Sequence, residues 1–226
     1  MAHGQGVGGR ASAVRERLGG VSGVAGVGVF VASVAVLHFL QPELSPWDVA
    51  ISDYVHGAYG WLLTLGLVAV GIGSLLLVVG LTRGVRGRWA SAGRLLVLLW
   101  ALGQLLAGIF PTDSTRHWSE PRSFSGIIHG NAALLAFLAL PAGALILLRS
   151  FRDDPRWQAS AGGLLALAVA SLITLVLFGA SLAPALVGHG LPVLLGLTER
   201  LMLAVYAAWL TVVGLGLMRH QSAGRR

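Results

Sequence analysis

The stretch ASAGGLLALAVASLITLVLFGASL, residues Ala159–Leu182, contains no charged residue and decides the fold class. An apolar run of about 20 residues is long enough to cross the ~30 Å hydrocarbon core of a bilayer as a helix. Lipid cannot hydrogen-bond the backbone, so such crossings must be helical. Five similar stretches lie elsewhere in the chain, at Gly19–Leu40, Ala58–Leu81, Ala90–Phe110, Gly126–Leu148 and Gly196–Met218. The sequence therefore predicts an all-α, polytopic membrane protein with a bundle of six transmembrane helices.

The composition agrees with a membrane protein. Only 11% of the 226 residues are charged, whereas about a quarter are charged in ordinary soluble domains. We expect one membrane domain over residues 19–218, with a disordered, Gly-rich basic tail at 1–18 and a basic tail at 219–226. The chain has no cysteine, which excludes disulfides, thiolate nucleophiles and cysteine-based metal sites.

The basic residues have a strongly uneven distribution. All sixteen are arginine, and arginine excess in short loops marks the cytoplasmic face of a membrane protein. Thirteen lie in the terminal segments, or in and beside the linkers after the second and fourth stretches: Arg10, Arg15, Arg17, Arg83, Arg86, Arg88, Arg94, Arg149, Arg152, Arg156, Arg219, Arg225 and Arg226. Both termini are therefore predicted to be cytoplasmic. Topology and attraction to anionic lipid explain this basicity, so no nucleic-acid partner is expected.

The source is inferred from composition. The use of arginine alone, with many Ala, Gly and Leu residues, is typical of a high-GC bacterial genome. This predicts the plasma membrane of a bacterium, with the lipid bilayer as the principal partner.

Acidic residues and histidines gather on the opposite, outer side. Six of the nine acidic residues lie there: Glu43, Asp48, Asp53, Asp113, Glu120 and Glu199. Five of the seven histidines share that side: His38, His56, His117, His129 and His189. Carboxylates contribute little to topology, so orientation alone does not explain the bias. The pattern predicts a functional site on the outer side.

Four residues are candidate catalytic groups: Asp53, Asp113, His129 and Glu199. His129 and Glu199 lie within the fourth and sixth apolar stretches, where ionisable groups are costly and normally face the bundle interior or a wet cavity. Carboxylates and an imidazole near one another in a low dielectric cannot all ionise, and acid/base catalysis uses this property.

Each candidate also has a structural interpretation. His129 could be a neutral histidine bonded to a carbonyl group, and Glu199 could form an ion pair between helices. The pair Ser52-Asp53 could cap the approach to the second helix, and Asp113 could close a turn.

Five further residues are candidate substrate-binding groups: Tyr54, Gln104, Asn131, Arg200 and Tyr206. Gln104 and Asn131 are polar residues inside helices, where hydrogen bonding between helices is the alternative role. Tyr206 follows Glu199 by seven residues, which places it on nearly the same helical face.

Several specific motifs are absent. The chain has no HExxH pair, and Ser125 and Ser181 lie in no nucleophile-elbow pattern. No cofactor is predicted. On ligand type alone, a divalent metal remains an alternative, held by Asp53, Asp113, His129, His189 and Glu199. A haem between His129 and either His38 or His189 is a weaker alternative.

Four short motifs, each at the outer end of an apolar stretch, carry a resemblance. They are Ile51-Ser52-Asp53-Tyr54, Phe110-Pro111-Thr112-Asp113, Ile128-His129-Gly130 and Gly196-Leu197-Thr198-Glu199-Arg200. In this order they resemble the bacterial six-helix membrane proteins catalogued as domain of unknown function 998, over about residues 20–218. The resemblance implies the six-helix architecture. It also implies that Asp53, Asp113, His129, Glu199 and Arg200 match the polar positions of the family, but it brings no settled reaction.

The main functional hypothesis is a membrane-embedded acid/base enzyme acting on a lipid-phase substrate at the outer leaflet. Asp113 and Glu199 would exchange protons, His129 would relay or orient, and Asp53 would position a neighbouring group or raise its pKa. Lipid hydrolysis, isomerisation and proton-initiated cyclisation of an isoprenoid all fit this chemistry. The alternatives are a proton-coupled transporter or lipid-binding protein, and a scaffold without catalysis.

Overall fold

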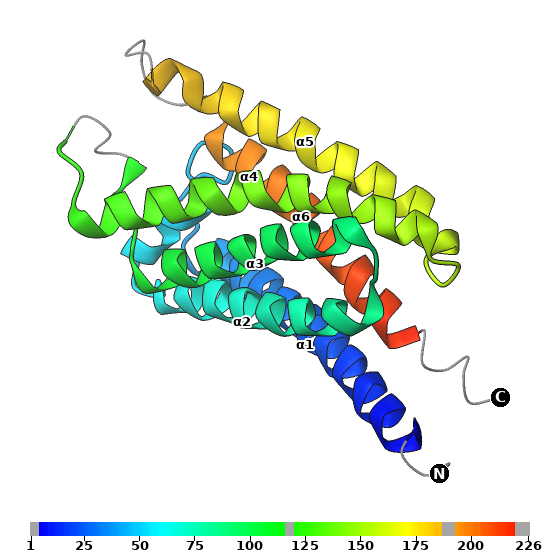
Figure 1. Ribbon diagram of the computed structural model, residues 1–226. Helices are drawn as coiled ribbons and strands as arrows, with labels where there is room; N and C mark the ends of the chain where they lie inside the picture. Colours follow the sequence, from blue (N-terminus) through cyan, green and yellow to red (C-terminus); the bar gives the residue numbers. More distant parts are fainter. Residues whose placement is uncertain (1–4, 116–119, 187–192, 220–226) are drawn as a thin grey trace.

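The computed structural model describes residues 5–115, 120–186 and 193–219, and every regular element among them is a helix (Figure 1). These helices are α1 (Gln5–Leu40), the short 3-10 helix η1 (Ile51–His56), α2 (Trp61–Gly84), α3 (Arg88–Ile109), α4 (Phe124–Asp153), α5 (Gln158–Leu186) and α6 (Leu195–Arg219). Six of them, α1 to α6, are long and apolar enough to cross a membrane. The prediction of an all-α protein with six membrane-spanning helices is confirmed.

The beginning of the chain is more helical than expected. Helix α1 begins at Gln5, inside the segment for which we expected disorder. The residues RASAVRERL at 10–18 include alanine, arginine, glutamate and leucine, which are all strong helix formers. A basic helical segment therefore precedes the first membrane span and is continuous with it. Residues 1–4 and 220–226, which belong to the two expected tails, lie outside the described residues.

The six long helices form a closed ring in chain order. Each packs against the next one in the sequence, and α6 closes the ring by packing against α1. Helices α4 and α6 touch each other very little, and α5 contacts both of them. Helix α5 is also the least buried of the six spans, and it lies along one edge of the bundle (Figure 1). The interior of the ring is therefore enclosed on the α5 side mainly by this one peripheral helix.

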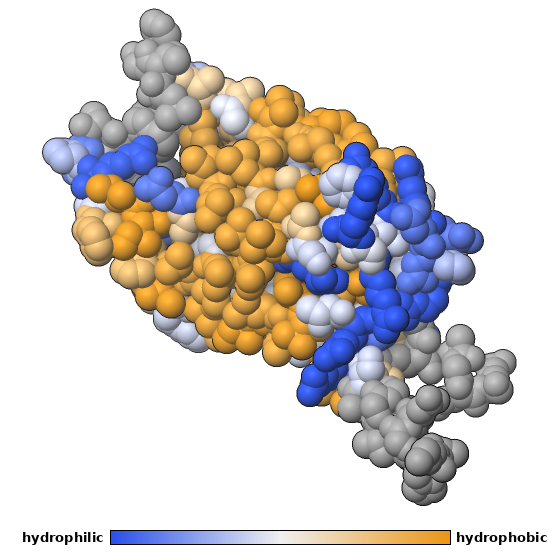
Figure 2. Space-filling view, viewed as in Figure 1, coloured by the Kyte–Doolittle hydropathy of each residue, from blue (hydrophilic) through white to orange (hydrophobic). Residues whose placement is uncertain are grey.

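The surface has the pattern expected of a protein that spans a bilayer. On the face drawn in Figure 2, a broad apolar band crosses the middle of the bundle, and hydrophilic residues gather at its two ends. We call one end the arginine end, because it carries the turns at residues 85–87 and 154–157 and the arginines around them. The other end carries η1 and the described parts of the α3–α4 linker, residues 110–115 and 120–123, and we call it the carboxylate end.

Small residues allow α1 and α2 to approach closely. A Cβ atom built on Gly26 would lie 2.4 Å from the carbonyl oxygen of Ala69, and one built on Gly19 would lie 2.6 Å from that of Leu76. Gly73 of α2 faces Gly26 in the same contact. Close backbone approach of this kind, at small residues, is a principal source of helix association in lipid, where apolar burial supplies little driving force.

Substitution of Gly26 tests this packing. Gly26→Ala is expected to lower the free energy of unfolding by about 1–3 kcal/mol, because the new methyl group forces the two backbones apart. Gly28→Ala on the same helix is the matched control, since its Cβ would meet no atom within 4 Å. Thermal unfolding of the purified protein in detergent measures both. Equal melting temperatures for the two variants would contradict the close contact.

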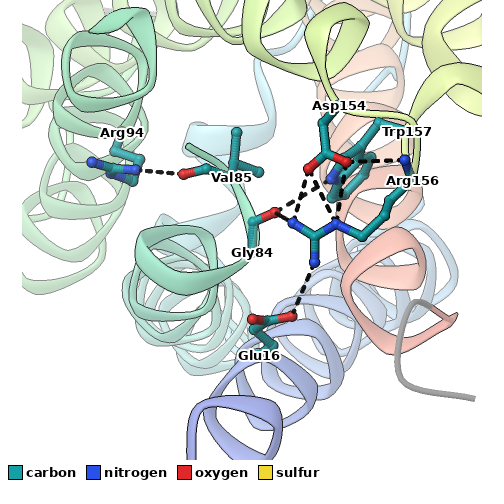
Figure 3. Close-up of polar contacts among 7 residues, drawn as sticks. All are labelled: Glu16, Gly84, Val85, Arg94, Asp154, Arg156 and Trp157. Carbon is teal, nitrogen blue, oxygen red and sulfur yellow. Dashed lines mark hydrogen bonds and ion pairs between the residues drawn. The ribbon is translucent and has the colours of Figure 1, made fainter. Parts of the chain in front are cut away.

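Polar contacts join the α4–α5 turn to the ends of α1 and α2 at the arginine end (Figure 3). Arg156 donates from Nη2 to the carbonyl oxygen of Gly84 at 2.7 Å and pairs with Asp154 at 2.8 Å. Its Nη1 lies 3.9 Å from Glu16 of α1. The hydrogen bond to Asp154 raises the pKa of Arg156 above its ordinary value. The neighbouring Trp157 is fully buried, so the α4–α5 turn is fixed on the ends of α1 and α2.

Candidate functional site

Arg200 holds the long linker between α1 and α2 against α6. Its guanidinium donates to Nε2 of His38 at 2.9 Å, to the hydroxyl of Tyr54 at 3.2 Å, and to the carbonyl oxygens of Val49 at 2.9 Å and Gly196 at 2.8 Å. The guanidinium carbon also lies 5.6 Å from the centre of the Tyr54 ring. Arg200 and Tyr54, which we expected to bind substrate, are thus occupied by contacts inside the protein.

Glu199 fixes η1 at the carboxylate end. It lies in the first turns of α6 with only 5% of its surface exposed. Its Oε2 accepts a hydrogen bond of 2.5 Å from the backbone N–H of Ile51, the first residue of η1. The side chain therefore joins two segments that are 148 residues apart in the sequence.

His129 is oriented by the end of α3. It is 7% exposed, and its Nδ1 lies 3.0 Å from the carbonyl oxygen of Ala107 and 2.9 Å from that of Phe110. Carbonyl oxygens only accept hydrogen bonds, so Nδ1 must carry the proton. In the neutral ring, Nε2 is then the nitrogen with a free lone pair. The same contacts satisfy carbonyl groups that the end of a helix leaves without a partner.

Glu199 and His129 line one small cavity inside the ring, near the carboxylate end. Its volume is about 30 Å³, which is room for about two water molecules. Side chains from η1 and every long helix except α5 line it: Phe30, Ile51, Ser52, Leu63, Leu67, Gln104, Ala107, His129, Ala133, Phe137, Glu199 and Leu203. Most of these residues are apolar, so the polar groups of the cavity lie in a low-dielectric setting.

The polar groups of the cavity retain unused hydrogen-bonding capacity. Gln104 is 2% exposed, yet within residues 5–115, 120–186 and 193–219 no hydrogen bond of the protein involves its amide group. The same holds for Nε2 of His129 and for Oε1 of Glu199 in that part of the chain. Buried polar groups are normally paired, so these three side chains are placed to bind polar atoms inside the cavity.

Asp53 and Asp113 lie outside the cavity lining and fix the α3–α4 linker instead. Asp53 is 4% exposed, and it accepts hydrogen bonds from the backbone N–H of Thr115 at 3.0 Å and from the Thr115 hydroxyl. Asp113 accepts from the backbone N–H of Ser123 at 2.9 Å. Ser123 in turn caps the beginning of α4. Both carboxylates thus order the segment that leads to His129.

The hydrogen bonds from Ser123 lower the pKa of Asp113 below its ordinary value of 3.8, and the charges of Arg122 and His56 act in the same direction. Because the folded-state pKa is lowered, the ionised carboxylate stabilises the linker at every pH above the ordinary pKa. The stabilisation is lost as the pH falls through the folded-state value.

Acidification is therefore expected to loosen the beginning of α4. Hydrogen exchange of residues 120–126 should accelerate in the wild-type protein as the pH is lowered from about 6 to about 3, after correction for intrinsic exchange rates. Asp113→Ala should already exchange faster at the higher pH and change less on acidification. Glu43→Gln, which removes an exposed carboxylate at the same end, is the control and should follow the wild type.

Two other expected substrate-binding residues also lie outside the cavity lining. The hydroxyl of Tyr206 donates to the carbonyl oxygen of Phe137 at 2.7 Å, which links α6 to α4. Asn131 is exposed on α4, and its side chain donates to the carbonyl oxygen of Ile127 in its own helix at 2.8 Å. Of the nine candidate residues, the cavity brings together Gln104, His129 and Glu199.

One cavity residue, Ser52, was not among the candidates. The structural alternative, in which Ser52-Asp53 caps the approach to the second helix, is not what the structure shows, because α2 begins only at Trp61, with Gly60 before it. Ser52 lies instead in η1, which the sequence pattern did not predict. A serine in a polar linker carries no local signal, because its position depends on the contacts of Ile51 and Asp53 with distant segments.

The described ranges contain no group of three or more His, Asp or Glu side chains placed to hold a metal ion. His189, which the metal and haem alternatives used, lies outside the described residues. Asp53 and Asp113 are occupied by the linker contacts given above.

Comparison with protein families gives one match. The family model described as "Protein of unknown function (DUF998)" matches residues 24–216, which is most of the chain and includes the whole cavity lining. No curated protein and no solved structure matches the chain.

Proposed function

The chain belongs to the DUF998 family of proteins of unknown function, and we propose that it is a membrane-embedded acid/base enzyme acting on a lipid-phase substrate. One observation carries the proposal. Glu199, His129 and Gln104, from three different helices, line the same apolar cavity with hydrogen-bonding capacity that the described protein groups leave unused. Asp53 and Tyr206, which are also buried, are by contrast hydrogen-bonded to other groups of the protein.

The contacts suggest a role for each residue. Glu199 exchanges a proton with the substrate through the oxygen that does not hold η1. His129, with its proton fixed on Nδ1, accepts a proton at Nε2 and returns it. The amide of Gln104 orients or stabilises a polar group of the substrate. Asp53 and Asp113 are positioning residues, because they order the linker that leads into α4.

The surroundings of the cavity favour a substrate that resides in the membrane. The lining is mostly apolar and belongs to membrane-spanning helices. A volume of about 30 Å³ holds the reacting group of a lipid and not the whole molecule, so the hydrocarbon part must lie between helices. We place that part on the α5 side, where α4 and α6 make little backbone contact and the Tyr206–Phe137 hydrogen bond crosses between them.

We propose further that the arginine end faces the cytoplasm of a bacterium and the cavity faces the outer leaflet. The arginine pattern supports this orientation. The natural chain has no cysteine, so single-cysteine variants report orientation cleanly. In intact cells, a membrane-impermeant maleimide should label Glu43→Cys and leave Arg86→Cys unlabelled; the reverse result would invert the orientation.

The catalytic proposal is tested with full-length protein in nanodiscs made from bacterial membrane lipids, including isoprenoids. Mass spectrometry follows the lipids over time and identifies any lipid that co-purifies. Glu199→Gln should lower turnover by about 100-fold or more, while the amide oxygen still accepts the Ile51 hydrogen bond and preserves the fold. Glu43→Gln, an exposed carboxylate at the same end, should retain turnover.

The alternatives give different results. A transporter would show pH-dependent solute flux in proteoliposomes without chemical change of any lipid. In a scaffold, no lipid would change with the wild-type protein, and Glu199→Gln would chiefly lower the melting temperature. Either result would overturn the enzymatic proposal.

A further inference from the structure

We propose that Ser52 is a catalytic nucleophile and that the substrate is an acyl ester of a membrane lipid. This inference rests on the proposed function and makes it more specific. It assigns a covalent reaction to the cavity, with His129 as the general base and Gln104 as the group that stabilises the oxyanion.

Ser52 is the serine of the cavity lining, on the side formed by η1. It is half-buried, and its hydroxyl group makes no hydrogen bond with any other group of the described segments. Other serines at the same end are occupied. The Ser125 hydroxyl donates to the carbonyl oxygen of Pro111 at 2.7 Å, and that of Ser181 donates to Phe178 at 2.7 Å.

The backbone around Ser52 is held from both sides. The residue before it, Ile51, donates its N–H to Glu199 at 2.5 Å. The residue after it, Asp53, is bound by the backbone N–H and the hydroxyl of Thr115. Helix α6 and the α3–α4 linker therefore hold the residues on both sides of this serine, which lines the cavity. Fixed placement of the nucleophile is a main source of catalytic rate.

His129 has one feature that a general base requires, a fixed tautomer, and it lines the same cavity as Ser52 without a hydrogen bond to it in the described chain. In serine hydrolases, an acceptor on Nδ1 fixes the tautomer, so that Nε2 is free to take the proton of the serine. Here the carbonyl oxygens of Ala107 and Phe110 take the place of the carboxylate. They orient the ring but carry no full negative charge, so they stabilise an imidazolium less than an aspartate would. The arrangement predicts a slow hydrolase or acyl transferase.

The reaction balances with groups on these helices and one water molecule. The Ser52 oxygen attacks the ester carbonyl while its proton passes to Nε2 of His129, and the Gln104 amide N–H donates to the oxyanion. Collapse breaks the bond to the alcohol, which leaves with the proton from His129. Water then attacks the acyl-serine, gives one proton to His129 and releases the fatty acid. The serine oxygen recovers that proton.

In the acylation step the role of Glu199 differs from the proton exchange proposed above, because here it positions the backbone beside Ser52. One of its oxygens holds the backbone beside Ser52, and the other faces the cavity without a partner in the described chain. A positioning role predicts a different kinetic signature from that of the base. Glu199→Gln should slow the acylation step much less than His129→Gln does, since its amide oxygen still accepts from Ile51.

The test is covalent labelling of the full-length protein in nanodiscs with a long-chain alkyl fluorophosphonate, followed by peptide mass spectrometry. The expected result is an adduct on Ser52 with loss of fluoride. Ser52→Ala should abolish it, His129→Gln should slow it by about 100-fold or more, and Ser125→Ala should leave it unchanged. Absence of an adduct, or an adduct on another residue, would overturn the proposal.

A second variant covers the case in which Ser52→Ala does not fold. Ser52→Cys keeps the size of the side chain and introduces a single thiol into a chain that has none. An apolar maleimide should modify that thiol if the residue faces the cavity. An unreactive thiol in a folded variant would contradict the placement of Ser52.

Measurements of lipid turnover test the Ser52 nucleophile separately from the acid/base enzyme proposed above. If Ser52→Ala retains turnover while Glu199→Gln loses it, the acid/base site stands and the nucleophile is wrong. If neither substitution changes turnover, both are wrong.

Discussion

Replacement of His129 by glutamine is expected to lower lipid turnover by about 100- to 10,000-fold, which is the usual contribution of a positioned general base. The variant should keep its fold, because the glutamine amide can still donate to the carbonyl oxygens of Ala107 and Phe110 that His129 contacts. What it lacks is a nitrogen that accepts and returns a proton. Turnover is measured by lipid mass spectrometry, and the fold by thermal unfolding in detergent.

His56→Gln is the matched control for this substitution. His56 is an exposed histidine at the same end of the bundle, so its loss should leave both turnover and melting temperature near those of the wild type. A purely structural His129 would give the opposite pattern, with a lower melting temperature and no selective loss of turnover. That result would remove the histidine from the catalytic mechanism.

Loss of Arg200 is expected to have the largest effect on stability. Arg200→Met removes a guanidinium that serves four acceptors on the linker, α1 and α6. Hydrogen bonds from a charged group contribute about 1.5–3 kcal/mol each, and their losses are not additive. We expect the free energy of unfolding to fall by about 3 kcal/mol or more. The stability of Arg200→Lys should lie between those of the wild type and Arg200→Met, because an ammonium group cannot reproduce the planar guanidinium.

The readout also separates two roles for this arginine. Arg152→Met is the control, since Arg152 is exposed at the arginine end and should change stability little. If Arg200→Met melts like the wild type but binds lipid more weakly, Arg200 is a substrate-binding residue, as the sequence suggested. A large loss of stability supports the structural role that its contacts indicate.

The six membrane helices could be predicted because their signal is local. Each apolar stretch reports its own crossing, through length and the absence of charge. The first residue of each helix was harder to predict. Helix α1 begins at Gln5, because helix-forming residues continue into a basic segment that hydropathy does not identify as membrane-spanning. The short helix η1 has no periodic signal at all, and tertiary contacts of Ile51 and Asp53 hold it in place.

The candidate site could be predicted in part. Glu199 and His129 stand out because an ionisable group inside an apolar stretch is costly and must have a protected setting. Hydropathy does not determine how a helix is rotated, which is why Asn131 points outward while Gln104 of α3 faces the cavity. Similarly, no local pattern tells that Arg200 binds four groups of the protein itself.

The exposed position of α5 has a consequence for kinetics. A molecule that reaches the interior by passing beside this helix arrives from within the leaflet, so its encounter rate depends on its mole fraction in the bilayer and not on its amount per volume of buffer. Dilution of the substrate with inert phospholipid should therefore slow the reaction at constant total substrate. Adding more buffer to the same vesicles should leave the rate per protein molecule unchanged.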